Sequence, residues 1–187
     1  MQTNLRQRAV RGFTLIELLI VVIIIAILAA IAIPQFSSSA GDAQESAMDA
    51  NLATIRSSIE LYRIQHNNTY PGVTLTSGGG GACAAAGGTL GNSVVNSEAS
   101  LRDQMTGFSN AAGATCTVAA TGFPFGPYMR AFPTEPITAS AVVTIINGAM
   151  TTPAANLVGW RYSLTTGQFN SNNIALDRSG VRTLFAH

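Results

Sequence analysis

One acidic residue, Glu17, stands inside an otherwise apolar segment and is the first side chain that could do chemistry. The segment, residues 13–33, reads FTLIELLIVVIIIAILAAIAI and has Thr14 as its other polar residue. At ~1.5 Å per helical residue it is about 31 Å long, enough to cross the ~30 Å core of a bilayer. A carboxylate at that depth costs free energy unless it is paired. Because no basic residue lies between Arg11 and Arg56, we expect its partner to come from elsewhere.

The stretch before the apolar segment is basic. Residues 1–12 carry Arg6, Arg8 and Arg11 and no acidic residue. Positive flanks stay in the cytoplasm, so we expect a single-pass protein of the cytoplasmic membrane with its N-terminus inside and the rest exported. A secretory signal peptide has its small-residue cleavage site after the apolar run. Here the small residue, Gly12, comes before that run, so the leader is of another kind.

Residues 11–17, Arg-Gly-Phe-Thr-Leu-Ile-Glu, resemble the N-terminus of type IV prepilins and of type II secretion pseudopilins. The resemblance includes the apolar helix, with Pro34 near its end. It implies that a prepilin peptidase removes the basic leader by cutting between Gly12 and Phe13, and that the new amino group of Phe13 is methylated. It also implies that Glu17 guides the docking of identical subunits, delivered by an assembly platform in the inner membrane.

The chemistry of the cleaved end agrees with this interpretation. Cleavage would create an ammonium on Phe13, four residues before Glu17 and inside the apolar layer. Within one helix that spacing brings the two groups near each other; in a bundle, the ammonium of an incoming subunit could instead neutralise Glu17 of its neighbour. The alternative is a plain signal anchor whose Glu17 lies at the membrane interface, which would leave the Gly12-Phe13 pair as a coincidence.

Composition bounds the exported part. Of the ten basic residues, all arginine, three lie in the leader, and the remaining seven face nine acidic residues. A mildly acidic protein is not expected to bind nucleic acid, which requires clustered basic charge. The two cysteines, Cys83 and Cys116, lie where an oxidising compartment permits a disulfide. We expect that bridge, with two independent buried thiols as the alternative.

The helical pattern continues beyond the membrane segment. Pro34 removes one backbone donor and predicts a kink. An apolar stripe then recurs at steps of four, three, four and three residues: Met48, Leu52, Ile55, Ile59 and Tyr62. Two ion pairs are expected on the solvated face: Arg56–Glu60 and Glu60–Arg63. We therefore expect one long helix over residues 13–66, apolar in 13–33 for the membrane or a filament core and amphipathic in 34–66.

Residues 67–187 are predicted to form a globular domain. Its first part, 71–96, is a loop rich in Gly and Ala, and Ser97 should then cap a short helix that Gly107 ends. Four segments read as strands: 116–118, 141–146, 158–164 and 168–170. The predicted class is α+β, with the long helix packed on a small antiparallel sheet, as in the pilin fold that the resemblance implies.

Two C-terminal stretches, residues 126–133 (GPYMRAFP) and 159–172 (GWRYSLTTGQFNSN), resemble the major pseudopilins of type II secretion. In that family an acid-rich loop after the hairpin holds calcium. Here residues 170–173 read Asn-Ser-Asn-Asn, and Asp177 is the nearest carboxylate. Calcium requires about six to eight oxygen ligands, usually several from carboxylates. We therefore expect no metal site and no cofactor, with calcium kept as the alternative.

No set of residues suits catalysis. His66, at the predicted end of the long helix, and His187 are expected on the surface, and no Ser/His/Asp set or pair of carboxylates can be argued. We predict a non-enzymatic subunit of a type IV pilus-like filament, periplasmic or on the cell surface after assembly. The C-terminal resemblance favours a pseudopilin of a type II secretion system. The alternative is a type IV pilin whose fibre serves adhesion, twitching motility or DNA uptake; a membrane-anchored enzyme is a third class.

Overall fold

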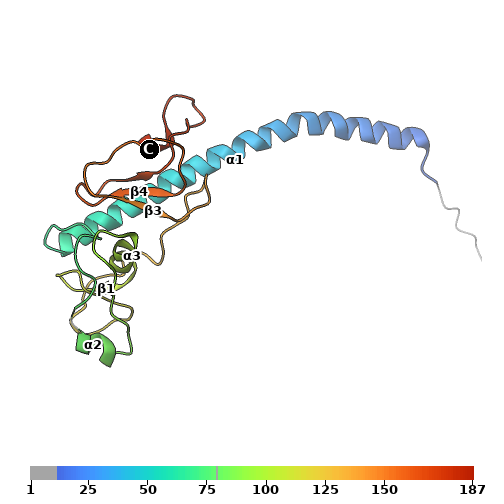
Figure 1. Cartoon of the computed structure of the whole chain (residues 1–187). Helices are drawn as coiled ribbons and strands as arrows, with labels where there is room; N and C mark the ends of the chain where they lie inside the picture. The colour runs from blue at the N-terminus through green and yellow to red at the C-terminus, as the bar shows by residue number, and fades with distance from the viewer. Residues whose placement is uncertain (1–11, 79) are drawn as a thin grey trace, which may run out of the picture. The chain divides into compact units, whose positions relative to one another are not determined.

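One long helix, α1 (Leu15–Gln65), supplies residues to both units into which the chain divides, one ending at Gly41 and the other spanning Asp42–His187 (Figure 1). The structure, a computed structural model, describes residues 12–78 and 80–187, without the side chains of 33–38. Pro34 is one of the residues whose side chains are not described, so the predicted kink there stays a prediction.

The second half of α1 forms the core of the globular unit. The five residues of the predicted stripe are each no more than 1% exposed: Met48, Leu52, Ile55, Ile59 and Tyr62. They share one core with residues of α3 and of the sheet: Leu101, Met105, Val143, Trp160, Tyr162 and Phe169. The helix ends because Asn67 and Asn68 take left-handed φ values of 52° and 61°, and the Asn68 amide donates to the Arg63 carbonyl.

The sheet of the globular unit has three strands in the order β3 (Val143–Ile146), β4 (Trp160–Ser163) and β5 (Phe169–Ser171). β4 and β5 form the predicted antiparallel hairpin, but β3 runs parallel to β4, so the sheet is mixed. The α+β class is thus confirmed, and the prediction of a wholly antiparallel sheet is wrong.

The parallel pairing depends on how β4 begins. The chain does not reverse into a hairpin at Asn147-Gly148, and residues 147–159 instead return it to the start of β3. There Gly159 has a φ of 74°, and a Cβ at this position would lie 2.3 Å from the Val142 carbonyl oxygen. Glycine therefore permits the close approach in which the Trp160 amide donates to Val142 O at 2.8 Å.

A short helix, α3 (Glu98–Thr106), lies between this core and a second, smaller one. Ser97 caps it as predicted, accepting from the Ser100 amide, while the Ser100 hydroxyl accepts from the Ser97 amide. Gly107 ends the helix, also as predicted. Thus the local signals at both helix ends were sufficient to place this element.

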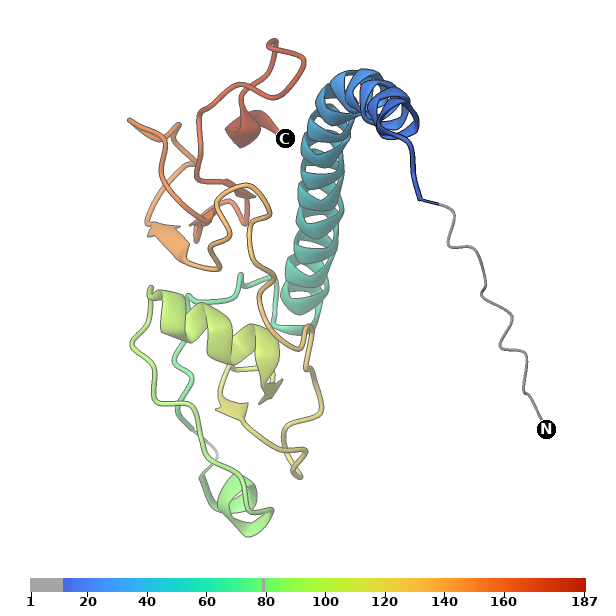
Figure 2. The same cartoon turned by 90° about the vertical axis from the view of Figure 1, so that its right-hand side faces the viewer.

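The second core lies at the end of the globular unit that is farthest from β3–β5 (Figures 1 and 2). It contains α2 (Gly80–Ala85), a helix inside what was predicted as a plain loop, and the antiparallel pair β1 (Phe108–Ser109) and β2 (Thr115–Cys116). The predicted disulfide joins α2 to β2, with Cα atoms of Cys83 and Cys116 5.8 Å apart. Cys83 is the buried residue of α2, so the disulfide gives this Gly/Ala stretch a tertiary anchor.

Candidate functional site at the start of α1

The three residues singled out at the N-terminus lie within six positions of one another. Gly12 and Phe13 precede α1 and are exposed, Phe13 to 83%. Glu17 lies in the first turn of α1, where a carboxylate is favoured by the positive end of the helix dipole. The residue just before the helix, Thr14, is its N-cap and connects the exposed end to Glu17.

Thr14 and Glu17 form a capping box. One carboxylate oxygen, Glu17 Oε2, accepts from the Thr14 amide at 2.9 Å and from the Thr14 hydroxyl at 2.7 Å. In return the Glu17 amide donates to Thr14 Oγ1 at 3.3 Å. These contacts satisfy helix N–H groups that have no partner inside the helix. The carboxylate is therefore fixed in its own turn of helix.

This capping box adds hydrogen-bond donors within the segment and leaves the expectation of a cationic partner from elsewhere as a prediction. The first partner is Thr14, three residues away, and the Thr-x-x-Glu spacing before an apolar run is the sequence signal that would have identified it. The second carboxylate oxygen, Oε1, has no hydrogen-bond partner in the part of the chain that the structure describes. Glu17 thus keeps one oxygen for a further donor.

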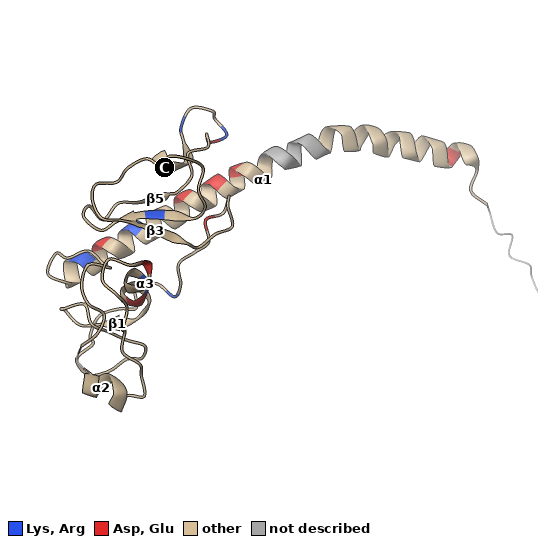
Figure 3. Ribbon diagram, viewed as in Figure 1, with Lys and Arg blue, Asp and Glu red and all other residues tan. Residues whose placement is uncertain are grey.

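The helix that follows Glu17 is apolar on all sides and is not covered by any of the residues that the structure describes. Residues Leu15–Ala32 are long and apolar enough to cross a membrane, and none of them is buried. Glu17 is the one charged residue of Leu15–Ala32, and Figure 3 draws the rest of this part of α1 in the colour of uncharged residues. An exposed apolar surface of this length requires lipid or other apolar helices as its surroundings.

Arg56 does not make the predicted pair with Glu60. Its Nε donates to Phe169 O at 2.9 Å and its Nη1 to His187 O at 3.1 Å, so the side chain binds the backbone of β5 and of the C-terminal segment. Glu60 instead pairs with Arg63, whose Nη2 lies 2.7 Å from Glu60 Oε2. This contact confirms the second predicted pair. Tertiary backbone acceptors thus displace a helix-surface ion pair worth only tenths of a kcal/mol.

The prediction of an exposed His66 is wrong, because this residue is only 2% exposed. Its ring is stacked on Tyr62, with centroids 3.7 Å apart, and its nitrogens contact Tyr62 O at 2.9 Å and Ser109 Oγ at 3.0 Å. Burial lowers the pKa of His66, partly offset by the Tyr62 carbonyl. The contacts connect α1 to β1, so His66 is a core residue of the globular unit.

The loop after the hairpin uses its amides for internal bonds. Asn170 Nδ2 donates to Phe185 O at 2.7 Å, Asn172 Nδ2 to Thr144 Oγ1 at 2.9 Å, and Asn173 Oδ1 accepts from the Ala175 amide. Among the described residues no group of three or more His, Cys, Asp or Glu is placed to hold a metal ion. This donor set therefore does not fit calcium, whose sites usually contain several carboxylates.

Comparison with known proteins places the similarity in the N-terminal part. Residues 7–33 match the family described as the prokaryotic N-terminal methylation motif. The type IV narrow pilus major component PilA5 of Thermus thermophilus is 46% identical over 55 residues, which is 29% of this chain and 47% of that protein. No solved structure matches the chain.

Type II secretion relatives match over a slightly longer stretch. The type II secretion system core protein G of Pseudomonas aeruginosa is 34% identical over 67 residues, which is 36% of this chain and 46% of that protein. The core protein G of Klebsiella michiganensis is 28% identical over 67 residues, with the same coverage. The chain spans about half the length of the curated relatives it matches.

The chain therefore carries an N-terminal methylation motif and is distantly homologous to type IV pilins and to type II secretion pseudopilins. Both kinds of relative are named as components of larger assemblies, in agreement with the prediction of a structural, non-enzymatic protein. The greatest identity among those described is to a pilin, and the longer stretches are to secretion proteins. The choice between the two is not decided by these matches.

Proposed function

We propose that this chain is the subunit of a type IV pilus-like filament, made as a prepilin, held in the inner membrane by α1 and then assembled with identical copies. The observation that carries the proposal is the Thr14–Glu17 cap at the head of an uncovered apolar helix, directly after Gly12-Phe13. A helix of this kind is stable only among lipids or among other apolar helices. Packing Leu15–Ala32 of many copies into a filament core supplies the second environment.

In this proposal the prepilin peptidase cuts between Gly12 and Phe13, and the new ammonium on Phe13 is methylated. The free oxygen Oε1 of Glu17 then accepts from an ammonium, that of its own chain or of the next copy. The cap leaves this oxygen available while it fixes the orientation of the carboxylate. An unpaired ion in an apolar layer is costly, so each arriving copy gains free energy by pairing both charges.

Processing is tested by intact mass. Wild-type protein recovered from filaments should begin at N-methyl-Phe13, and Gly12→Val should remain as the uncut precursor in the membrane. Gly12 is exposed, and a Cβ added at this position would have no atom within 4 Å, so the substitution does not disturb the fold. Wild-type filaments that still carry residues 1–12 would refute the processing step.

Of the two identities, we favour a pseudopilin of a type II secretion system. The support is the C-terminal resemblance in residues 126–133 and 159–172, together with the matches to core protein G. A type IV pilin of a surface fibre is the second candidate, favoured by the 46% identity to PilA5. Deleting the gene distinguishes them: lost secretion of exoproteins indicates a pseudopilin, whereas lost surface fibres with normal secretion indicate a pilin.

A further inference from the structure

The one Asn-Gly pair of the sequence lies where the chain leaves β3. Asn147 comes directly after Ile146, the last residue of β3, and Gly148 follows it. Asn147 is exposed. An asparagine can react with its own main chain, because its side-chain amide carbon lies within reach of the backbone nitrogen of the next residue. A glycine at that next position has no Cβ to hinder the approach.

Both reacting groups of this pair are without a hydrogen-bond partner in the part of the chain that the structure describes. The Asn147 side chain makes no hydrogen bond there, and neither does the Gly148 amide. Only the Gly148 carbonyl is engaged, since it accepts from the Ser163 hydroxyl at 2.5 Å. A Cβ added at Gly148 would have no atom within 4 Å, so the space beside the amide is open. The two groups can therefore approach each other without breaking a hydrogen bond.

Most other asparagine side chains of the globular unit are held by hydrogen bonds. Asn172 Nδ2, for example, donates to Thr144 Oγ1 at 2.9 Å. A side chain that is held in this way must give up its hydrogen bond before it can react. The other asparagines with such a bond are Asn51, Asn67, Asn68, Asn110, Asn170 and Asn173.

Three further asparagines have no side-chain hydrogen bond to any described residue, but the backbone amide that each would need is occupied. They are Asn92, Asn96 and Asn156. The amides that follow them belong to Ser93, Ser97 and Leu157, and they donate to Thr76 Oγ1 at 2.9 Å, Ser100 Oγ at 3.3 Å and Asn172 O at 3.1 Å. Among the described asparagines, Asn147 therefore combines an unbound side chain with an unbound amide after it.

We propose that Asn147 is a site of spontaneous deamidation, at which the chain converts its own asparagine into aspartate or isoaspartate. The Gly148 nitrogen attacks Cγ of Asn147, so that a new C–N bond closes a five-membered imide while the bond from Cγ to Nδ2 breaks. Nδ2 leaves as ammonia and takes up the proton that the Gly148 amide loses. Water then opens the imide at either of its carbonyl carbons. Ammonia is lost, water is consumed, and no oxidant or reductant is needed.

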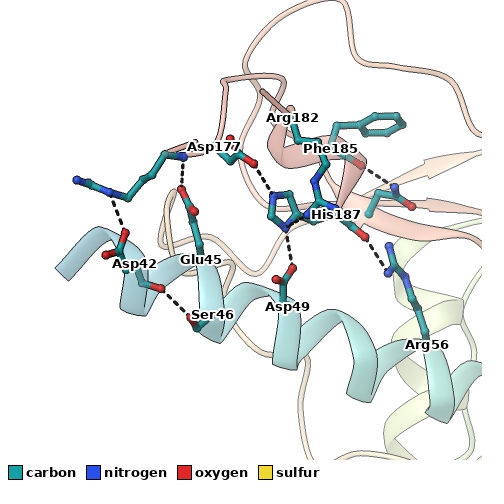
Figure 4. A network of polar contacts seen from close by, with 11 residues as sticks. Asp42, Glu45, Ser46, Asp49, Arg56, Asp177, Arg182, Phe185 and His187 are labelled. Carbon is teal, nitrogen blue, oxygen red and sulfur yellow. Dashed lines mark hydrogen bonds and ion pairs between the residues drawn. The ribbon is translucent and has the colours of Figure 1, made fainter. Parts of the chain in front are cut away.

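The reaction places a carboxylate in a stretch that has none. Between residues 136 and 176 the one charged residue is Arg161. The charged side chains that Figure 4 shows belong instead to α1 and to the C-terminal segment, as Asp49 and Asp177 do. Asn147 also lines a shallow cleft, in which deamidation would introduce the first charge. The other residues that line it are Val73, Asn96, Leu164 and Thr165.

The isoaspartate product also changes the backbone. Its main chain runs through the side-chain carbon, which inserts a methylene group between Ile146 and Gly148. Ile146 O accepts from the Leu164 amide at 3.0 Å, and Gly148 O accepts from Ser163, so both neighbours are tied to the end of β4. A longer chain should loosen these contacts. The reaction occurs within one chain and is independent of the proposed filament function.

Mass spectrometry of the full chain, incubated in detergent micelles and mildly alkaline buffer, tests the site. With time, the peptide that contains Asn147 should gain the small mass of an exchange of NH2 for OH, and ammonia should be released in equal amount. Asn147→Gln should abolish the change at this position, because glutamine would have to close a larger ring. Wild-type chain in which Asn147 persists, or in which other asparagines react first, would overturn the proposal.

A second variant separates the effect of the structure from that of the dipeptide. Leu157→Gly creates another Asn-Gly pair, whose amide is bound to Asn172 O in the folded chain. Leu157 is 43% exposed, so its removal leaves the core intact. In the folded variant Asn156 should deamidate several times more slowly than Asn147, and in concentrated urea the two should react at similar rates. Equal rates in the folded variant would show that the free amide does not select Asn147.

Discussion

The two halves of α1 have the same backbone and opposite surroundings. Within Leu15–Ala32 the large apolar side chains are exposed on every face, whereas the stripe from Met48 to Tyr62 is buried against α3 and the sheet. In the first half apolar residues leave no polar face; in the second they recur at the helical period. The difference shows that the first half must find its partners outside the chain, while the second finds them inside it.

The largest expected effect concerns the outside partners. Glu17→Leu removes the costly carboxylate, so the protein should enter membranes at least as well as wild type. Filament yield should nevertheless fall by more than about tenfold, because an incoming ammonium would be left unpaired in an apolar layer. The measurement is the ratio of filaments to membrane-bound subunit. Normal yield at normal subunit level would mean that Glu17 is only a tolerated interfacial residue.

Two milder variants separate the functions of the cap and the charge. Glu17→Gln keeps the shape and one oxygen acceptor, so a defect in it isolates the negative charge. Thr14→Val removes the hydroxyl that donates to Glu17 Oε2 and accepts from the Glu17 amide, but it leaves the charge. A small loss of yield, well below that of Glu17→Leu, is expected for Thr14→Val.

The second half of α1 should respond in the opposite way. Ile59→Ala opens a cavity in the core and should destabilise the globular unit by about 2–5 kcal/mol, with no change in membrane insertion. Ile64→Ala is the matched control, because Ile64 is 75% exposed and its loss should cost less than about 0.5 kcal/mol. The measurement is denaturant unfolding of the full chain in detergent, followed by the fluorescence of Trp160. Equal destabilisation by both variants would contradict the division of the helix.

The second core offers a comparison within the globular unit. Residues 71–97 and 107–129 carry no charged side chain, and Figure 3 shows none around α2. The disulfide and a few buried residues therefore hold this part without ion pairs: Cys83, Ala114, Cys116 and Phe123. Replacing both cysteines by serine should lower the free energy of unfolding by about 3–4 kcal/mol. This is the chain-entropy contribution of a disulfide between residues 33 positions apart.

Two measurements check the bridge. Native, unreduced protein should show no reactive thiol, and unfolding should shift to lower denaturant in the double serine variant. Membrane insertion should not change, since the bridge lies outside α1. Two thiols titrating in the native protein would show that the bridge does not form.

Much of this architecture could be predicted because its signals are local or periodic. The stripe in α1, the caps of α3 and the β4–β5 hairpin each depend on residues close in sequence. β3 could not be placed the same way, because its parallel partner is selected by a glycine, Gly159, that approaches Val142 only in the folded chain. The sequence pattern predicts the strand but not that it runs parallel to β4.

The sequence predicts which residue of the candidate site carries the charge but not which hydrogen bonds its side chain makes. Glu17 stands out because a carboxylate in an apolar run is costly, whereas its hydrogen bonds to Thr14 follow from the Thr-x-x-Glu spacing of a capping box, which a search for a basic partner does not reveal. The helical spacing predicts Glu60 as the partner of Arg56, but its acceptors are backbone oxygens more than a hundred positions away. Local pattern rules cannot rank such distant acceptors above nearby side chains.

The smallest expected effect tests His66, which the sequence placed on the surface. Because burial lowers its pKa, the folded protein binds a proton there less readily than the unfolded chain. The stabilisation that the neutral His66 ring contributes should therefore be fully present above the unfolded-state pKa of about 6.5. It should be lost as the pH falls below that value. The measurement is the unfolding midpoint of the full chain at several pH values down to about 5.

The control removes the second histidine, His187, so that no other imidazole is present. In the His187→Gln background His66 is the one remaining histidine, so any loss of stability in this window is assigned to it. His66→Gln in the same background should remove the decline, because glutamine stays neutral on acidification. It should also lower stability at neutral pH, because the stacking on Tyr62 is lost. An unchanged pH dependence in His66→Gln would show that other groups, and not the buried ring that joins α1 to β1, make the globular unit sensitive to acid.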